Sequence, residues 1–258
     1  MNESRMTAAG TLYIVPTPIG NLEDITLRAL RILRETETIA CEDTRVTGSL
    51  LRHFDIPRKR LISYFAGNEE GRIEQILRIL REGGDVALVS DAGTPGISDP
   101  GTRLVAAAIR EGIAVVPLPG PTALVTAVTA SGLPTDSILF EGFLPHKKGR
   151  RRALEKLAVE ERTMVLYESP HRILKTLREL GEHLDPARPA VLCRELTKMY
   201  EEINRGSLAE LHDLYAARPS IRGEFVVVIA GRERRKGAGR RTERDGGISF
   251  DREEPDTE

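Results

Sequence analysis

The sequence predicts an α/β protein of two domains, with a mostly parallel sheet in the first domain and a mixed sheet in the second. Short aliphatic strands alternate with amphipathic helical stretches in the first half, as in folds with helices on both faces of a parallel sheet. Residues 86–89 and 114–116 are apolar throughout, as expected of strands buried on both faces. The length of 258 residues is enough for two modest domains.

The first predicted domain spans residues 11–133. Its candidate strands are short and aliphatic, and apolar residues recur at helical spacing in the stretches between them. The strands are predicted at residues 12–15, 38–41, 61–64, 86–89 and 114–117, and the helices at residues 25–34, 68–82, 102–111 and 122–131.

The second predicted domain spans residues 134–231. The boundary falls at residues 132–136, where Gly132 ends one helix and Pro134 blocks its continuation. Five strands with fewer helices indicate a more mixed sheet. The strands are predicted at residues 138–143, 163–167, 190–194, 200–205 and 224–230, and the helices at residues 150–160, 172–183 and 208–217.

Both ends of the chain are predicted to lie outside the folded body. Residues 1–10 form a flexible N-terminus without the apolar segment of a signal peptide. Residues 232–258 carry eight basic and eight acidic side chains and, apart from Ile248 and Phe250, almost nothing that could enter a core. This composition is typical of a disordered charged tail.

Composition narrows the functional classes. No apolar run approaches the roughly 20 residues of a membrane-spanning helix, so no membrane partner is expected. The net charge of −1 argues against a generic nucleic-acid binder. Cys41 and Cys193 are isolated, which favours core roles and fits a reducing cytoplasm. The five histidines lack the spacing of metal ligands, so no metal is expected.

Two loops that follow predicted strands are rich in glycine and proline. In residues 16–22, prolines stiffen the loop and Gly20 lets the backbone approach a ligand, although a rigid turn before a helix capped by Asp24 is equally compatible. Residues 90–101 match neither the dinucleotide-binding nor the Walker glycine pattern. There Asp91 is the acid expected nearest a cationic or hydroxyl-bearing ligand, and Asp99 with Pro100 would start a helix. A purely structural turn is the alternative.

Two further loops combine proline with a helix start. In residues 117–123, Pro121 fits the first turn of a helix whose free N–H groups could receive an anionic group, although capping without a ligand is equally compatible. In residues 167–172, Ser169 could cap a helix, which would place Glu168 and His171 near its start. Glu168 and His171 could also be ordinary surface residues.

A basic segment opens the helix predicted at residues 150–160. Cations at a helix N-terminus oppose the helix dipole, so local stability does not explain them. Contact with nucleic-acid phosphate would explain them, and a solvated run of charge is the alternative. The segment contains Lys147, Lys148, Arg150, Arg151 and Arg152.

Several motifs, in order along the chain, together resemble the tetrapyrrole methylase superfamily, and within it the ribosomal RNA small subunit methyltransferase I family. The resemblance covers about residues 10–231. Its motifs are TLYIVPTPIGNLEDIT at 11–26, CEDTR at 41–45, LVSDAGTPGISDPG at 88–101, PLPGPTA at 117–123, GFLP at 142–145 and YESPHR at 167–172.

This resemblance implies a fold of two α/β domains of the tetrapyrrole methylase type, with S-adenosylmethionine in the cleft between them, and a homodimer. It implies 2′-O-methylation of a cytidine in the decoding region of 16S rRNA, whereas other members of the superfamily methylate uroporphyrinogen or precorrins, or make diphthine. The cofactor-binding residues that it implies are Pro16, Gly20, Asp91, Gly93, Gly96, Ile97, Ser98, Thr122, Ala123 and Tyr167.

A ribose hydroxyl is a poor nucleophile, so a general base would help methyl transfer to it. Glu168 and His171 are the candidates, while Arg45 and the basic segment would position RNA phosphate. Two rival functions stay open: a tetrapyrrole C-methyltransferase on the same fold and a non-catalytic ribosome assembly module. The basic segment and the YESPHR motif argue against the first, and the intact cofactor loops argue against the second.

Overall fold

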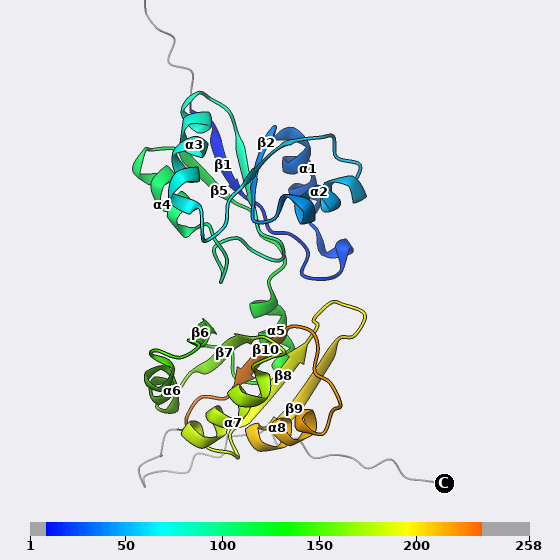
Figure 1. The fold of residues 1–258 in the computed structure, drawn as a ribbon, viewed down its shortest axis with the longest axis vertical. Coiled ribbons are helices and arrows are strands. Elements are labelled where there is room, and N and C mark those ends of the chain that lie inside the picture. Colours follow the sequence, from blue (N-terminus) through cyan, green and yellow to red (C-terminus); the bar gives the residue numbers. More distant parts are fainter. Residues whose placement is uncertain (1–8, 234–258) are drawn as a thin grey trace, which may run out of the picture. The chain divides into compact units, whose positions relative to one another are not determined.

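The computed structural model describes residues 9–233, which form two compact units that divide between Ala123 and Leu124 (Figure 1). Most of the predicted flexible N-terminus and of the predicted charged tail therefore lies outside the described residues. Within the described part of the chain, no helix is long and apolar enough to cross a membrane.

The first unit is built on a sheet of five parallel strands in the order β3-β2-β4-β1-β5. One face is covered by α1 and α2, and the other by α3 and α4 (Figure 1). This confirms the predicted parallel sheet with helices on both faces. The elements are β1 (Thr11–Ile14), η1 (Leu22–Asp24), α1 (Leu27–Glu35), β2 (Thr38–Cys41), α2 (Thr44–His53), β3 (Arg60–Ser63), α3 (Glu69–Arg81), β4 (Val86–Val89), α4 (Thr102–Arg110) and β5 (Ala114–Pro117).

The second unit holds a mixed sheet in the order β6-β7-β10-β8-β9, as predicted. Strands β6 and β7 are parallel, whereas β10 is antiparallel to both β7 and β8, and β8 to β9. Apolar side chains of α6, α7 and α8 pack on this sheet. The elements are α5 (Ala123–Ser131), β6 (Ile138–Phe143), α6 (Arg150–Ala158), β7 (Thr163–Glu168), α7 (Ile173–Leu184), β8 (Pro189–Arg194), β9 (Glu202–Ser207), α8 (Leu208–Ala216) and β10 (Phe225–Ile229).

Helix α5 groups with the second unit, whereas the sequence placed it in the first, ahead of a boundary at 133/134. Hydrogen bonds explain the shift. The Leu124 amide donates to the Tyr167 hydroxyl at 3.0 Å, and the Arg205 guanidinium donates to the Ala130 carbonyl. Both ends of the helix are thereby fixed to the second sheet. The Gly132 and Pro134 turn residues in the sequence do not reveal these contacts.

Helix starts are where the sequence was least informative. Thr26, not Asp24, caps α1 through a 3.0 Å hydrogen bond from the Ala29 amide. Helix α4 begins at Thr102 after Gly101, so Asp99 is not its N-cap. Helix α2 was not predicted, because Gly48 and several β-branched residues lower its helix propensity.

Candidate functional site

Three loops meet at the carboxyl edge of the parallel sheet in the first unit. Thr17 and Gly93 exchange backbone hydrogen bonds of 2.9 and 3.0 Å, which join the loops after β1 and β4. The Thr94 hydroxyl donates to the Pro121 carbonyl at 2.9 Å, which joins the loops after β4 and β5. These loops follow three neighbouring strands, and the carboxyl ends of such strands are where open α/β sheets bind ligands.

The loop after β4 needs its glycines. Gly93 and Gly96 have φ angles of +84° and +85°, in the left-handed region that side chains with a Cβ rarely adopt. Ser98 takes φ +63° without being glycine, an uncommon backbone conformation of the kind that is enriched at functional sites. Ile97 and Ser98 are exposed, so the loop presents a fixed, strained surface to solvent.

An acidic cluster lies where β2 and β4 end side by side. One carboxylate oxygen of Asp91 accepts a hydrogen bond from the Asp43 amide at 3.0 Å. Burial raises the pKa of Asp91 and of Glu42 above their ordinary values, and the neighbouring carboxylates add to the effect. A partly buried carboxylate of this kind suits a ligand that carries a positive charge or hydroxyl groups.

Asp43 and Glu42 were not predicted as site residues. Asp43 caps α2 and forms a 2.6 Å ion pair with Arg45, whose hydrogen bonds lower the Asp43 pKa to about 2. The two acidic residues directly after β2 could have revealed them. Because β2 lies beside β4 in the parallel sheet, residues that follow β2 lie close to Asp91, which follows β4. The Arg45 side chain is 89% exposed and reaches away from the core.

The remaining predicted cofactor residues are divided between the units. Pro16 is buried in the loop after β1, where a Cβ on Gly120 would approach its Cβ to 2.6 Å, and Gly20 is exposed further along that loop. Thr122 and Ala123 lie at the start of α5. Tyr167 lies on β7 in the second unit.

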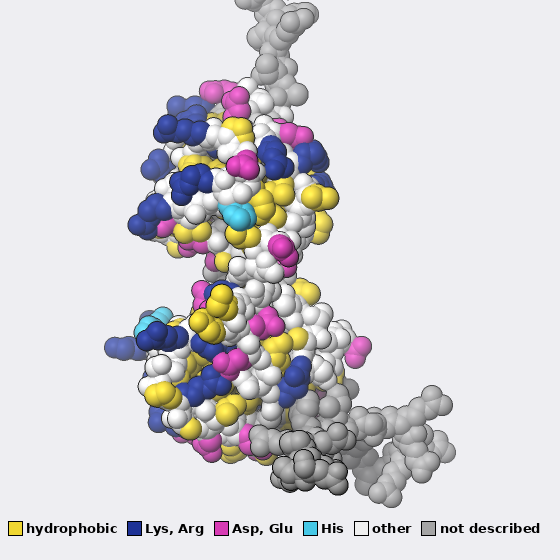
Figure 2. Space-filling view, turned by 90° about the vertical axis from the view of Figure 1, so that its right-hand side faces the viewer, with side chains coloured by type: hydrophobic (Ala, Val, Ile, Leu, Met, Phe, Trp, Pro, Cys, Tyr) yellow, Lys and Arg dark blue, Asp and Glu magenta, His cyan; other side chains and the backbone are white. Residues whose placement is uncertain are grey.

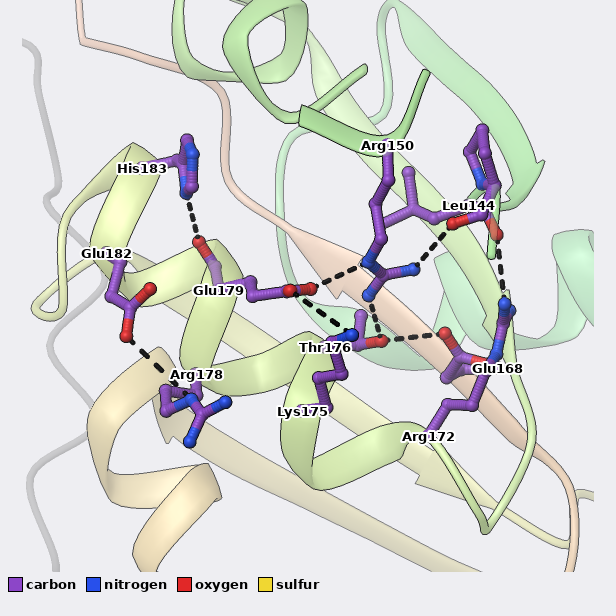
Figure 3. A network of polar contacts seen from close by, with 11 residues as sticks. Leu144, Arg150, Glu168, Arg172, Lys175, Thr176, Arg178, Glu179, Glu182 and His183 are labelled. Carbon is purple, nitrogen blue, oxygen red and sulfur yellow. Dashed lines mark hydrogen bonds and ion pairs between the residues drawn. The ribbon is translucent and has the colours of Figure 1, made fainter. Parts of the chain in front are cut away.

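Glu168 does not have the environment of a general base. It is only 2% exposed, and its carboxylate accepts hydrogen bonds from the Ser169 amide, the Arg172 guanidinium and the Thr176 hydroxyl at 2.7–2.8 Å (Figure 3). A carboxylate enclosed by these donors anchors the loop after β7 and cannot reach a substrate hydroxyl. The prediction of a catalytic Glu168 is therefore corrected, because the side chain at the end of β7 turns into the core.

The turn that follows Glu168 also differs from the prediction. Ser169 accepts backbone hydrogen bonds from Arg172 and Ile173 through its carbonyl, and α7 begins only at Ile173 without a side-chain cap. His171 lies exposed in this turn. Of the two candidate bases, only His171 is accessible to a substrate.

Arg150 also departs from its predicted role. Its side chain is 7% exposed, forms a 2.7 Å ion pair with Glu179, and donates to the Thr176 hydroxyl and the Pro145 carbonyl at 2.7 and 3.1 Å (Figure 3). Arg150 is therefore not available to RNA phosphate. The sequence could not separate it from its neighbours, because one position along a helix turns the side chain by about 100°.

The other cations of the basic segment are exposed. Arg151 forms only a surface pair with Glu155, four residues along α6. Within residues 9–233, Lys147, Lys148 and Arg152 have no carboxylate within ion-pairing distance. Four of the five cations of the basic segment that were predicted to contact phosphate therefore remain open to a ligand.

Comparison with known proteins shows the family to which the chain belongs. The family model of the Tetrapyrrole (Corrin/Porphyrin) Methylases matches residues 11–212. Proteins named ribosomal RNA small subunit methyltransferase I are similar over most of their length. The protein from Halalkalibacterium halodurans is 54% identical over 86% of this chain and 76% of its own. The one from Hydrogenobaculum sp. is 50% identical over 85% and 95%, and that from Escherichia coli O157:H7 is 49% identical over 89% and 81%.

Solved structures share the fold at lower sequence identity. Uroporphyrin-III C-methyltransferase from Thermus thermophilus, complexed with S-adenyl homocysteine, has a TM-score of 0.61 at 22% identity and covers 86% of this chain and 97% of its own. Cobalt precorrin-4 methyltransferase has a TM-score of 0.63 at 20% identity, with coverage of 85% and 94%. The fold is that of a tetrapyrrole methylase. The chain belongs to this family and, within it, to the ribosomal RNA small subunit methyltransferase I group.

Proposed function

We propose that this protein transfers a methyl group from S-adenosylmethionine to the ribose 2′-hydroxyl of a cytidine in 16S rRNA, near the decoding centre. The observation that carries the proposal is the roughly 50% identity, over most of the chain, to proteins named for methylation of small-subunit rRNA. The joined loops and the exposed cations supply physical support for a methyl-donor site and an RNA contact.

The three-loop edge fits S-adenosylmethionine. The close backbone contact of the loops and the positive φ angles of Gly93 and Gly96 leave main-chain groups, rather than bulky side chains, to face a ligand. Asp91 would lie near the hydroxyl groups or positive charge of the cofactor, and exposed Ile97 would cover its apolar parts. When bound, the cofactor supplies a methyl group on a positively charged sulfur.

The protein's own contribution is orientation and proton transfer. Holding the acceptor hydroxyl in line with the donor accounts for much of the rate enhancement available to such a reaction. With Glu168 enclosed by donors, His171 is the residue we propose to accept the hydroxyl proton. His171→Ala should lower kcat with little change in cofactor affinity. An unchanged kcat would exclude His171 as the base.

RNA phosphate would contact Arg45 and the four exposed cations of the basic segment. The test compares two matched double variants in the second unit, each of which removes two exposed cations: Lys147→Ala/Lys148→Ala, and the control Lys175→Ala/Arg178→Ala on α7. The first should flatten the slope of log K against log salt by about 0.7–0.9 for each phosphate that the protein no longer neutralises. Equal slopes in both variants would show that the basic segment does not contact RNA.

The reaction itself is tested by mapping. Purified protein, labelled S-adenosylmethionine and unmodified 16S rRNA or assembled small subunits should give one 2′-O-methylated cytidine. Methyl transfer to a porphyrinogen instead would support a tetrapyrrole C-methyltransferase, and RNA binding without cofactor binding would support an assembly module. Sedimentation of the full chain would test the predicted homodimer, and cell fractionation the predicted cytoplasmic location.

A further inference from the structure

Phe143 is a large apolar side chain that the fold leaves in solvent. It ends β6, the edge strand of the second sheet, and is 53% exposed, while the next residue, Leu144, is buried. A single exposed apolar residue needs no explanation. Phe143 differs because the backbone around it is fixed and because the exposed cations of the basic segment begin four residues further along the chain, at Lys147.

A β-bulge aims the Phe143 ring. The register of β6 against β7 shifts between Phe140 and Gly142, and Gly142 takes φ +68°. The extra residue places Phe140 and Phe143 on the same face of the sheet, where both rings pack edge-on against Tyr167, at centroid distances of 5.0 and 5.8 Å. Bulges that redirect a side chain in this way occur next to active sites.

The backbone that follows Phe143 is clamped by two arginines (Figure 3). Arg172 donates to the Leu144 carbonyl and Arg150 to the Pro145 carbonyl, each at 3.1 Å. Each arginine is itself paired at 2.7 Å with a glutamate, Arg172 with Glu168 and Arg150 with Glu179. The ring is therefore held in place before any ligand arrives, which lowers the entropy cost of stacking on it.

The charged residues that follow Phe143 in the sequence indicate which kind of ligand its ring would contact. Lys147, Lys148, Arg151 and Arg152 lie within nine residues of Phe143 and are exposed. Figure 2 shows dark-blue cationic side chains and a cyan histidine on the second unit, with yellow hydrophobic and magenta acidic side chains on the same face. An exposed aromatic side chain followed along the chain by exposed cations fits single-stranded RNA binding, in which a base stacks and phosphates pair with Lys or Arg.

From these observations we propose that Phe143 stacks on an unpaired base of the RNA substrate, and that the flanking phosphates contact the basic segment. The proposal rests on the proposed function and adds a specific base contact to it. Since base–aromatic stacking needs no particular base edge, Phe143 would hold the strand in place, while the choice of nucleotide would be made elsewhere.

The test measures binding of the full chain to 16S rRNA transcribed in vitro, at several salt concentrations. Phe143→Ala should weaken binding about 5- to 100-fold at every salt concentration, with an unchanged salt slope, because stacking releases no counterions. Phe143→Trp should restore binding. The matched control is Phe65→Ala, which removes another exposed phenylalanine, 43% exposed, from the first unit and should change nothing.

Each other outcome has one meaning. If the parent protein binds and methylates rRNA but Phe143→Ala binds like the parent, the stacking proposal fails and the proposed function stands. If Phe143→Ala loses S-adenosylmethionine affinity in calorimetry while RNA binding is unchanged, Phe143 contacts the cofactor and the proposal is overturned. If the parent neither binds nor methylates rRNA, the proposed function itself fails.

Discussion

The loop edges of the two units are held together by different forces. In the first unit, backbone pairs such as Thr17 with Gly93, and the hydroxyl of Thr94, join the loops. In the second unit, the loops after β6 and β7 are held by two arginine–glutamate pairs with little exposure, Arg150 with Glu179 and Arg172 with Glu168. In the first unit the loops after β1, β4 and β5 are thus joined through neutral groups, with an acidic cluster beside them, whereas in the second unit the loops are joined through charged pairs.

The difference between the two sets of contacts follows from the residues in each loop. The loop after β4 carries glycines and small residues, so main-chain hydrogen bonds can fix it without crowding a ligand. The loop after β6 leads into exposed cations that repel one another and oppose the dipole of α6. Anchoring that segment takes strong, directional contacts, and charge-assisted arginine hydrogen bonds provide them.

The largest expected effect is on stability, at the arginine–glutamate pairs of the second unit. Arg150→Ala leaves the Glu179 carboxylate with only Lys175, at 3.8 Å, so the free energy of unfolding should fall by about 3 kcal/mol, as for other broken buried ion pairs. Urea unfolding followed by circular dichroism measures it. The neighbouring Arg151→Ala, which removes a surface pair, should leave stability nearly unchanged. Equal losses of unfolding free energy in both variants would show that the buried Arg150 contributes no more to stability than the exposed Arg151.

The second prediction concerns the loop after β4 in the first unit. Gly96→Val forces a β-branched side chain into φ +85°, so the loop after β4 should shift and S-adenosylmethionine affinity should fall at least about tenfold. The control is Gly112→Val, which imposes similar strain at φ +71° beyond the end of α4, where nothing lies within 4 Å of the added Cβ. Calorimetric titration should show normal affinity for the control. Normal affinity in both variants would place the cofactor elsewhere.

The smallest effect is expected at a half-exposed ion pair of the second unit. Arg218 lies 2.6 Å from Glu202, and its hydrogen bond lowers the pKa of Glu202 from 4.5 to about 2. A lowered carboxylate pKa adds stability that is present above pH 4.5 and is lost as the pH falls toward 2. Glu202→Gln should therefore lower the free energy of unfolding at pH 7 by at most about 1 kcal/mol.

The pH dependence checks the cause of that loss. The stability difference between the parent and Glu202→Gln should shrink when the unfolding measurements are repeated at pH values from about 4.5 down to about 3, because Glu202 of the unfolded parent takes up a proton in this range while the folded parent keeps it ionised. A difference that stays constant over this range would mean that the glutamine acts through packing and not through the ion pair with Arg218.

The sequence by itself determined the fold class and the order of the strands, although it missed helix α2. Continuous apolar runs such as Val86–Val89 can be buried only between two layers of helices, and glycines and prolines mark where the strands end. The edge on which the loops meet followed from the rule that parallel strands end together. These are local or topological properties, so a single sequence carries them.

Tertiary structure decided which side chains of each motif face solvent. Glu168 and His171 are three residues apart in one motif, yet one is buried under three donors and the other is exposed. Arg150 and Arg151 are adjacent, yet only Arg150 reaches Glu179 on α7. Whether such a side chain is buried or exposed depends on the rotation of its helix and on partners distant in the chain, which residue type and spacing do not encode.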